Sequence, residues 1–418
     1  MNKPKIVERK AEAVKEASAV LYTATAAKKN ALLRAIAGRL EKESTSILRQ
    51  NEADLAAARA AGISAVLLDR LALNEKRISQ MVAGVRDVIS LPDPVGEVLD
   101  RQRRPNGLVI EKVRVPLGAV GIIYEARPNV TIDAAALCLK AGNAVLLKGG
   151  SEALKSNSAL VAVVKRALRD VGLPAGCVEF IDTADRSAVA ELIKLDKYID
   201  IIIPRGSQTL IRFIQENSAV PVIAHGEGNC HVYVDGSANL RDAVEIVFNA
   251  KVQRPSVCNA AEKLLIDEKV AVRYLPRIAA RLRKARVELR GDRKSRSIVA
   301  DMLPATEEDW HKEYLDLVMA VKVVKGVDEA IAHINRYGSH HSDSIVTANK
   351  ARGEKFLREV DSAAVYVNAS TRFTDGFEFG LGAEIGISTQ KLHARGPMGL
   401  AELTSTKFVV RGKGQVRK

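Results

Sequence analysis

Cys258 is the residue whose type and surroundings most directly offer chemistry. It lies in the segment Val252–Glu262, VQRPSVCNAAE, with Arg254, Ser256 and Asn259 close by in the sequence. A neighbouring cation or helix end favours the thiolate, which is the nucleophilic form of cysteine. Free cysteine is also among the most buried residue types, so packing is an equal alternative. The residues alone leave Cys258 open between a nucleophile and a core residue.

The other cysteines and the histidines do not predict a metal site. Cys138 lies in an apolar run and Cys177 opens a predicted strand, so both fit packing roles. The cysteines form no CxxC pair and no metal-ligand spacing, so we expect neither a disulfide framework nor a zinc site. His340 and His341 are adjacent, and adjacent strand residues point to opposite faces, so we expect no bound metal there.

Two glycine and serine turns follow predicted strands. Gly149-Gly150-Ser151 comes after NAVLLK, and Gly206-Ser207 comes after DIIIPR. A turn of this kind before a helix leaves backbone N–H groups free to bind an anion. Lys148 adds a positive charge at the carboxyl end of its strand, where open α/β sheets bind ligands. Each turn alone is weak evidence for a dinucleotide site, because the GxGxxG fingerprint is missing. The two turns together favour a shared dinucleotide site.

The segment Arg127-Pro128-Asn129 follows another predicted strand, GIIYEA. Asn129 could cap a helix that starts near Thr131. Its side-chain amide could instead donate a hydrogen bond to an oxyanion, as acyl chemistry requires. The residues alone favour capping.

The elements that must position these residues follow an α/β pattern. Apolar residues recur at helical spacing over residues 6–91, which predicts a helical N-terminal layer. After Pro116, the Val- and Ile-rich runs AVGIIYEA, NAVLLKGG, CVEFIDTA, DIIIPRG and VPVIAHG alternate with helical stretches. A second series, HVYVDG, KLLIDE, MAVKVVKG, SDSIVTAN and AVYVNAS, follows a boundary near Gly226–Asn229. Such alternation predicts two doubly wound α/β domains, each with a parallel sheet.

Residues 98–116 predict a two-stranded ribbon around Pro105-Asn106-Gly107, because Asn-Gly supplies the positive φ angles of a tight turn. The C-terminal run KFVV predicts one more strand, which we expect to pair with a neighbouring subunit. The ribbon and this strand predict a homo-oligomer, a dimer or larger. The predicted domains are residues 1–226 with the cofactor site, residues 227–384 with Cys258, and a return segment over residues 385–418.

Composition narrows the class of protein further. The chain has 418 residues, of which 47% are hydrophobic, 27% charged and 4% aromatic, as in ordinary α/β proteins. It shows no signal-peptide core and no run near the ~18 apolar residues that a membrane span needs, so we expect a cytoplasmic protein. The net charge of +14 is spread along helical segments such as Arg277–Arg286. We therefore expect an anionic substrate rather than nucleic acid or a membrane as the partner.

Four longer motifs carry a family resemblance. They are QRPSVCNAAE around Cys258, VDEAIAHINRYGSHHSDSI over Val327–Ile345, YEARPNVT over Tyr124–Thr131, and LLKGGSEA over Leu146–Ala153. With them the chain resembles, along essentially its whole length, the glutamate-5-semialdehyde dehydrogenase family of the aldehyde dehydrogenase superfamily. The resemblance implies an aldehyde-dehydrogenase-like α/β fold with two doubly wound domains and a small oligomerisation ribbon.

The resemblance also implies roles for the candidate residues. Cys258 would be the nucleophile, Asn129 the oxyanion-hole amide, and Glu313 in EYLDLV the residue that holds the nicotinamide ribose. The turn at Gly206 and Ser207 would face the cofactor pyrophosphate. The residues implied in NADP(H) binding are Lys148, Gly149, Gly150, Ser151, Glu152, Gly206, Ser207 and Glu313.

One departure from the superfamily bears on the reaction. Hydrolytic aldehyde dehydrogenases carry a water-activating glutamate in an ELGGK-like segment, whereas the similar position here reads HGEGN, with His225 at the equivalent place and Glu227 two residues later. An acyl phosphate needs no water for its reduction, which agrees with this change. We expect Arg127, Arg254 and His225 to bind an anionic substrate, with a structural ion pair as the alternative for each arginine.

The implied activity is the NADPH-dependent reduction of L-glutamyl 5-phosphate to L-glutamate 5-semialdehyde and phosphate through a cysteine thioester. This reaction is the second step of proline biosynthesis from glutamate, and a separate glutamate 5-kinase would supply the substrate and could associate with the protein. The first alternative is a hydrolytic NAD(P)-dependent aldehyde dehydrogenase acting on another aldehyde. The second is a basic nucleic-acid-binding protein with an inactive dehydrogenase-like fold, against which the retention of Cys258 argues.

Overall fold

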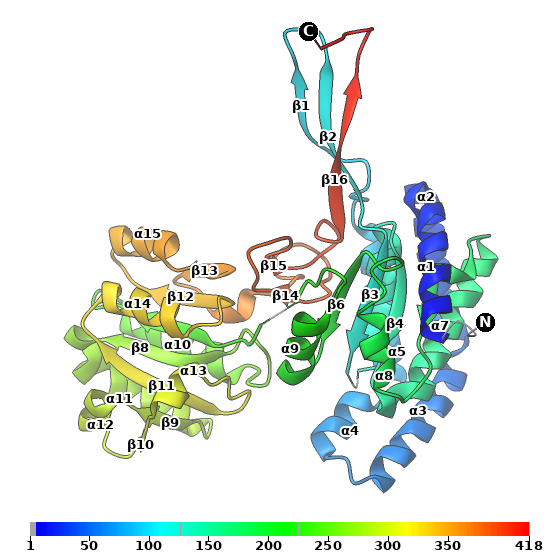
Figure 1. The fold of residues 1–418 in the computed structure, drawn as a ribbon. Coiled ribbons are helices and arrows are strands. Elements are labelled where there is room, and N and C mark those ends of the chain that lie inside the picture. Colours follow the sequence, from blue (N-terminus) through cyan, green and yellow to red (C-terminus); the bar gives the residue numbers. More distant parts are fainter. Residues whose placement is uncertain (1–5, 126, 225, 418) are drawn as a thin grey trace. The chain divides into compact units, whose positions relative to one another are not determined.

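The computed structural model describes residues 6–125, 127–224 and 226–417, and the chain divides into two compact units (Figure 1). Unit 1 contains Met1–Ala224, Gly380–Gly386 and Met398–Lys418. Unit 2 contains His225–Phe379 and Ile387–Pro397. The three predicted domain ranges of the sequence remain a proposal.

The N-terminal part of unit 1 is a helical layer, as the sequence predicts. Side chains cap two of its helices: Thr25 accepts from the Lys28 N–H, and Asn74 accepts from the Arg77 N–H. The helical spacing of apolar residues gives each long helix one buried face. The helices are α1 (Ile6–Tyr22), α2 (Ala26–Lys42), α3 (Ser44–Ala60), α4 (Ala65–Leu71) and α5 (Glu75–Ser90).

A parallel four-stranded sheet forms the centre of unit 1, in the order β5-β4-β3-β6. Its strands are β3 (Ala119–Tyr124), β4 (Ala144–Lys148), β5 (Val178–Phe180) and β6 (Ile201–Arg205), and its helices are α6 (Asn129–Lys140), α7 (Leu154–Asp170), α8 (Ser187–Leu192) and α9 (Gln208–Asn217). The expected strand in VPVIAHG is wrong. Only an isolated bridge joins Val222 to Ile202, because Pro221 has no N–H with which to extend a ladder. Short 3-10 turns are η1 (Ser151–Ala153) and η2 (Ala175–Cys177).

Unit 2 is built on a parallel seven-stranded sheet in the order β10-β9-β11-β8-β7-β12-β13. The sequence series omitted two short strands on one side of this sheet, the edge strand β10 (Leu303–Pro304) and its neighbour β9 (Glu288–Gly291). The other strands are β7 (Cys230–Val234), β8 (Ala261–Asp267), β11 (Val318–Val324), β12 (Ser342–Val346) and β13 (Ala364–Val367). The short pair β14 (Ile387–Ser388) and β15 (Gly396–Pro397) also belongs to this unit.

Helices cover both faces of this sheet. Alternate residues of β8 point to opposite faces, so Leu264 and Ile266 join one core and Leu265 joins the other. The first core includes residues of α10 (Leu240–Val252) and α11 (Glu268–Lys284), and the second includes residues of α14 (Val327–Tyr337) and α15 (Lys350–Glu359). The remaining helices are α12 (Arg293–Ile298), α13 (Glu307–His311) and the 3-10 turn η3 (Thr371–Phe373). The predicted doubly wound α/β fold is therefore confirmed.

The predicted ribbon has three strands rather than two. Strands β1 (Val98–Arg103) and β2 (Val109–Pro116) are antiparallel, and Gly107 in their turn has a φ of 89°. Strand β16 (Thr404–Arg411) pairs with β2 of the same chain over its whole length. The C-terminal strand thus pairs with β2 along one edge. It lies at the end of the strand order β1-β2-β16, so the expectation that it also pairs with a neighbouring subunit stays a prediction.

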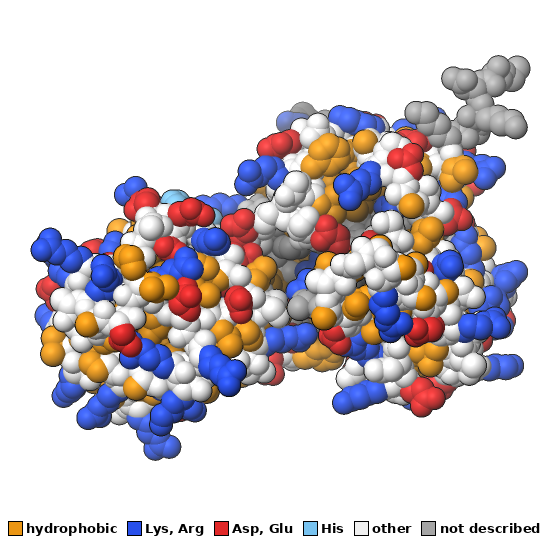
Figure 2. Space-filling model, turned by 90° about the horizontal axis from the view of Figure 1, so that it is seen from below, with side chains coloured by type: hydrophobic (Ala, Val, Ile, Leu, Met, Phe, Trp, Pro, Cys, Tyr) orange, Lys and Arg blue, Asp and Glu red, His pale blue; other side chains and the backbone are white. Residues whose placement is uncertain are grey.

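The basic residues are dispersed over the surface, as the sequence predicts. On the face drawn in Figure 2, Lys and Arg side chains lie scattered among acidic and hydrophobic ones and do not gather into a single stripe. In the described part of the chain, no helix combines the length and apolarity that a membrane crossing requires.

Candidate active site

Cys258 lies in the loop between α10 and β8, at the amino edge of the unit 2 sheet. It is half-buried, whereas Cys138, Cys177 and Cys230 are buried. Burial raises the pKa of the Cys177 thiol to about 12 and raises the pKa values of Cys138 and Cys230 as well. The packing roles predicted for Cys138 and Cys177 are confirmed. Cys258 is the cysteine that a reagent or substrate can reach.

A second loop, which runs from Gly226 into β7, touches the Cys258 loop backbone to backbone. A Cβ added at Gly228 would lie 1.7 Å from the carbonyl oxygen of Cys258 and 2.4 Å from its Cα. No side chain can be placed there without moving one of the loops. The Cys230 thiol lies 3.2 Å from the same carbonyl oxygen. Sequence reasoning missed Gly228, although the two glycines of HGEGN were a signal for close backbone approach.

Glu313 lies at the same edge of the sheet, in the segment before β11. Its carboxylate accepts a hydrogen bond of 2.8 Å from the Gly228 N–H. Burial raises the pKa of Glu313 to about 7, against the lowering effect of that bond, and the nearby carboxylates Glu262 and Glu227 raise it further. Glu313 is therefore tied to the loop that supports Cys258, and near neutral pH it exists in both protonation states.

A buried ion pair joins the helix and the strand on either side of the Cys258 loop. Lys251 at the end of α10 and Glu262 in β8 are joined at 3.0 Å, and both side chains are fully buried. Glu262 also accepts from the Leu315 N–H. Burial lowers the pKa of Lys251 and raises that of Glu262, and their mutual attraction opposes both changes. This pair fixes the two elements from which the Cys258 loop departs.

The predicted cofactor residues of unit 1 all stand at the carboxyl edge of its sheet. Lys148 ends β4, Gly149 to Glu152 follow it, and Gly206 and Ser207 follow β6. Lys148 is buried, which lowers the pKa of its amine, and its Nζ donates to the Gly149 carbonyl at 2.9 Å. The carboxyl ends of β4 and β6 flank that of β3, so the two turns lie at one edge.

An anionic side chain already occupies the start of α9. The Ser207 N–H and hydroxyl donate to Glu125 at 2.8 Å and 2.9 Å. A Cβ added at Gly206 would lie 2.7 Å from the Glu125 carboxyl carbon. The turn therefore binds a carboxylate closely, which fits the predicted role of this site for the phosphates of a dinucleotide.

Gly149 gives a second observation on whether the turns of unit 1 fit a dinucleotide. A Cβ added there would lie 2.2 Å from the Asn157 side-chain nitrogen, so the chain after β4 can follow this path only with glycine. The donors gathered at this edge, an ammonium, hydroxyls and backbone N–H groups, suit phosphate and ribose oxygens. The residues of unit 1 thus fit a nicotinamide dinucleotide.

Asn129 does not cap its helix. Helix α6 begins at Asn129 itself, Pro128 is the N-cap residue, and no side-chain cap bond is formed, so the capping interpretation is wrong. The Asn129 amide donates to Asp133 at 3.0 Å. Burial raises the pKa of Asp133 to about 6, although that hydrogen bond opposes the rise. The amide of Asn129 is therefore held in place by a side chain one turn further along α6.

The remaining predicted residues fall in three places. Arg127 is exposed just after β3 in unit 1, and Arg254 is exposed near Cys258 in unit 2. His225 lies outside the described residues. Unit 2 thus brings together Cys258, Arg254 and Glu313, and unit 1 brings together the other described candidates, which are Arg127, Asn129, Lys148, Gly149, Gly150, Ser151, Glu152, Gly206 and Ser207.

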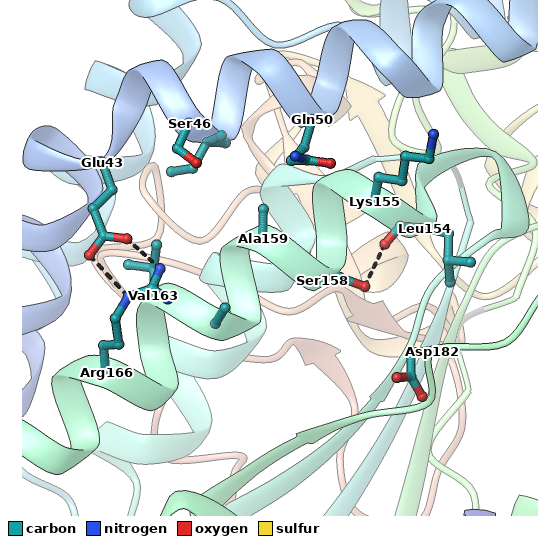
Figure 3. A pocket seen from close by; sticks show the side chains of 12 residues that line it. Glu43, Ser46, Gln50, Leu154, Lys155, Ser158, Ala159, Val163, Arg166 and Asp182 are labelled. Atoms are coloured by element: carbon teal, nitrogen blue, oxygen red, sulfur yellow. Dashed lines mark hydrogen bonds and ion pairs between the residues drawn. The ribbon is translucent and has the colours of Figure 1, made fainter.

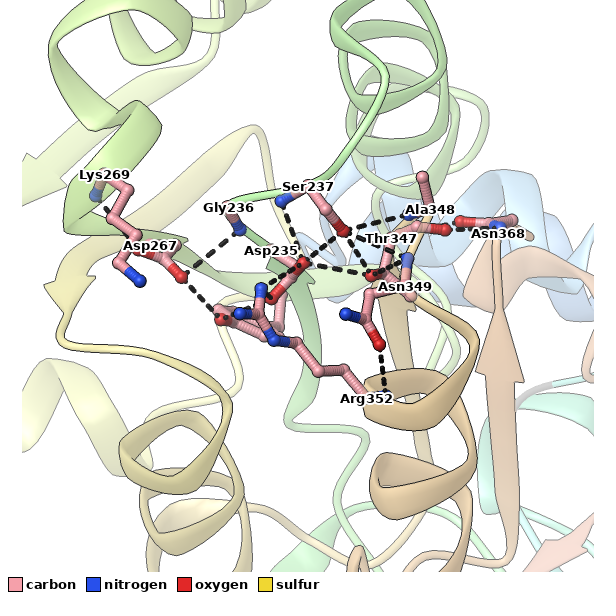
Figure 4. Close-up of polar contacts among 11 residues, drawn as sticks. Asp235, Gly236, Ser237, Asp267, Lys269, Thr347, Ala348, Asn349, Arg352 and Asn368 are labelled. Carbon is pink, nitrogen blue, oxygen red and sulfur yellow. Dashed lines mark hydrogen bonds and ion pairs between the residues drawn. The ribbon is translucent and has the colours of Figure 1, made fainter.

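The opposite, carboxyl edge of the unit 2 sheet carries a polar network that no prediction named (Figure 4). Asp235 accepts from the hydroxyls of Ser237 at 2.6 Å and Thr347 at 3.0 Å, and Arg352 donates to it at 3.0 Å. Gly236 donates its N–H to Asp267 at 3.2 Å. The network joins the ends of β7, β8 and β12, which is a structural role.

A cavity of about 540 Å³ lies between α3 and α7 of unit 1 (Figure 3). Small side chains such as Ala159 and Ser158 face it, and Arg166 pairs with Glu43 at one end. None of the site residues named above lines it.

Comparison with known proteins shows which protein family the chain belongs to. A model described as "Aldehyde dehydrogenase family" matches residues 2–297, so the chain belongs to the aldehyde dehydrogenase family. Within that family its relatives are more specific. It is 58% identical to the γ-glutamyl phosphate reductase of Carboxydothermus hydrogenoformans, over 97% of this chain and 98% of that one. It is 55% identical to the γ-glutamyl phosphate reductase of Moorella thermoacetica over the full length of both chains.

A solved structure gives the same result. The crystal structure of γ-glutamyl phosphate reductase from Thermotoga maritima matches with a TM-score of 0.98 and 54% identity, over 99% of this chain and 100% of that chain. The chain therefore groups with the γ-glutamyl phosphate reductases, and the resemblance predicted from its motifs is confirmed.

Proposed function

We propose that the protein catalyses the NADPH-dependent reduction of L-glutamyl 5-phosphate to L-glutamate 5-semialdehyde and phosphate. The observation that carries this proposal is Cys258, a half-buried cysteine whose loop is held against Gly228 at the amino edge of a sheet. The relatives that match the chain over its full length bear the name of this activity. In metabolism, the reaction is the second step of proline biosynthesis from glutamate.

The Cys258 thiolate attacks the γ-carbonyl carbon of the acyl phosphate, and the bond from that carbon to the phosphate oxygen breaks. The glutamyl group is then held as a thioester on Cys258, and inorganic phosphate is released. When bound, NADPH would supply a hydride to the thioester carbonyl. The resulting oxyanion expels the sulfur as thiolate, which leaves the aldehyde and regenerates Cys258.

Negative charge develops on the carbonyl oxygen in both steps. The Asn129 amide and the backbone N–H of Cys258 are the donors that would stabilise it, each worth about 3 kcal/mol in comparable sites. The hydrogen bond from Asn129 to Asp133 supports this role because it fixes the amide in one orientation.

The cofactor would be held by Lys148, by the turns at Gly149, Gly150, Ser151, Glu152, Gly206 and Ser207, and by Glu313. Ser207, whose N–H and hydroxyl donate to the Glu125 carboxylate, would be one of the residues that bind the anionic part of the cofactor. Arg127, Arg254 and His225 would bind the anionic groups of the substrate. A homo-oligomer, a cytoplasmic location and association with a separate glutamate 5-kinase complete the proposal.

Phosphate dependence of the reverse reaction tests the function. With L-glutamate 5-semialdehyde and NADP⁺, we expect absorbance from NADPH to appear only when phosphate or arsenate is supplied, because the thioester needs that nucleophile. A hydrolytic aldehyde dehydrogenase would instead use water. Equal rates with and without phosphate would favour that alternative and refute the proposed reaction.

A further inference from the structure

Arg372 bridges the two ends of the Cys258 loop. Its Nε donates to the side-chain oxygen of Gln253 at 2.8 Å, and its Nη1 donates to the side-chain oxygen of Asn259. Gln253 precedes Cys258 in the loop and Asn259 follows it directly. The guanidinium of Arg372 therefore lies across the loop that presents the nucleophile.

Hydrogen bonds from side chains to backbone carbonyl groups fix the segment that carries this arginine. The Asn259 amide donates to the carbonyl oxygen of Thr374 at 2.8 Å, and the Thr371 hydroxyl donates to the carbonyl oxygen of Asn259 at 2.7 Å. Asn259 and Thr371 are both buried. Arg372 lies between Thr371 and Thr374 in the sequence, and both of these residues are hydrogen-bonded to Asn259, so the position of Arg372 relative to the loop is defined on both sides.

The charge around Arg372 is unbalanced. Burial lowers the pKa of Arg372, repulsion from Arg254 lowers it further, and the negative charges of the Cys258 thiolate and of Asp375 oppose these effects. Among the described residues, neither Arg254 nor Arg372 forms an ion pair with a carboxylate. Two neighbouring guanidinium groups without such a partner attract an anion with several acceptor oxygens.

The donors needed for such an anion are present. A guanidinium carries five N–H groups, and two of those on Arg372 serve the loop. We infer that Arg372 and Arg254 form the site for the phosphate group of the substrate, a conclusion that rests on the proposed reduction of an acyl phosphate. Arg254 was a general candidate for substrate binding, whereas Arg372 was not predicted at all.

The bond that breaks explains why the phosphate, rather than the α-carboxylate, belongs here. The phosphate oxygen is attached directly to the carbon that Cys258 attacks. A cation held against the Cys258 loop is therefore close to the phosphate, whereas the α-carboxylate lies at the far end of the carbon chain. The arginine pair would also stabilise the negative charge that grows on the departing phosphate.

The test is the apparent KM for phosphate in the oxidation of L-glutamate 5-semialdehyde by NADP⁺. We expect Arg372→Met to raise this KM at least tenfold, a factor that corresponds to about 1.4 kcal/mol, and to leave the KM for NADP⁺ unchanged. Arg372→Lys keeps the positive charge but loses the two parallel N–H donors of the guanidinium. Its KM for phosphate should therefore lie between those of the wild type and Arg372→Met. Arg277→Met, at an exposed arginine of α11, is the matched control and should change neither constant.

Arg254→Met keeps the test decisive if Arg372→Met does not fold, because Arg254 is exposed. It should also raise the KM for phosphate. A second readout uses no turnover: inorganic phosphate should slow the alkylation of Cys258 by iodoacetamide in the wild type and should lose this effect in both variants.

The outcomes separate two failures. If wild-type turnover does not depend on phosphate, the proposed reaction is wrong. If wild-type turnover depends on phosphate but folded Arg372→Met or Arg254→Met variants keep its KM and its protection of Cys258, the arginine site is refuted while the reaction stands.

Discussion

The two edges of the unit 2 sheet differ in how they use their polar groups. At the carboxyl edge, Asp235 accepts hydrogen bonds from Ser237, Thr347 and Arg352, so the charge is balanced within the protein (Figure 4). At the amino edge, Glu313 has a raised pKa and the Arg254 and Arg372 guanidinium groups repel each other. The carboxyl edge thus satisfies its own polar groups, whereas the amino edge is where we propose that an anion binds.

This difference runs against the usual rule for open parallel sheets. Such sheets bind ligands at the carboxyl ends of their strands, and the proposed cofactor residues of unit 1 follow that rule. In unit 2 the proposed nucleophile, Cys258, lies at the amino ends of the strands, and the polar network at the carboxyl ends has a structural role. Substitutions at the two edges should therefore separate activity from stability.

The largest effect is expected for Cys258→Ala. Without the thiolate no thioester forms, so turnover should fall by at least about 10³-fold. Binding of NADPH, measured by fluorescence titration, should be largely unchanged because the proposed cofactor contacts lie mainly in unit 1. Loss of both cofactor binding and folding in this variant would show that Cys258 is a structural residue.

The next largest effect is expected for Gly228→Ala, and Gly236→Ala at the opposite edge is its control. The new Cβ at position 228 would collide with the Cys258 backbone, whereas at position 236 its nearest contact would be the Asp267 side chain at 3.0 Å. We expect kcat to fall about 100-fold or more for the first variant, as a displaced catalytic group does, and to change little for the second. Similar losses in both would contradict the assigned difference between the edges.

Asp235→Asn should lower stability and spare catalysis. Burial alone would raise the pKa of Asp235, but hydrogen bonds from Ser237, Thr347 and Arg352 lower it below its ordinary value. A lowered carboxyl pKa stabilises the fold above the unfolded pKa of about 3.9, and this contribution is lost as the pH falls through the folded value.

In urea unfolding at pH 7, we expect Asp235→Asn to lose about 2–3 kcal/mol. Its stability should then vary less than that of the wild type below pH 4. Per folded molecule, kcat and KM should match the wild type. A fall in kcat without loss of stability would place the carboxyl edge in the active site after all.

The smallest effect is expected for Glu313→Gln on stability. The folded pKa of about 7 lies above the unfolded value, so the wild type loses stability as the pH rises from the unfolded pKa toward 7. Glutamine does not titrate, so the variant should gain stability over the wild type at pH 8 relative to pH 4. The full pKa shift would correspond to about 3 kcal/mol, which solvent screening at this half-buried side chain reduces to about 1–2 kcal/mol. Urea unfolding at both pH values, with exposed Glu354→Gln as control, measures this. A gain that is equal at both pH values would show that ionisation of Glu313 is not its source.

The sequence predicted most of the strands because their Val- and Ile-rich runs are buried on both faces and leave a clear pattern. It failed where a local residue changed backbone pairing, as Pro221 does beside β6. It also failed at Asn129, because helix α6 starts two residues earlier than the cap assignment required, and helix boundaries depend on local geometry.

The candidate site was predictable to the extent that its residues form local motifs. Cys258 and the glycine turns are read from short segments, whereas Arg372 meets Gln253 and Asn259 only through the fold. Gly228 was partly predictable: the sequence shows a glycine there, but it does not show that the Cys258 backbone lies against it. Contacts between segments far apart in the chain leave no spacing pattern to read.

The pairing of β16 with β2 bears on how the chain is made. Every strand of the seven-stranded sheet lies between these two partners in the sequence, so that sheet can be complete on the ribosome before the ribbon closes. Strand β2 must then wait with one edge open throughout the synthesis of unit 2. The charged residues along it, among them Glu111, Lys112 and Arg114, would keep that edge from aggregating until its partner emerges.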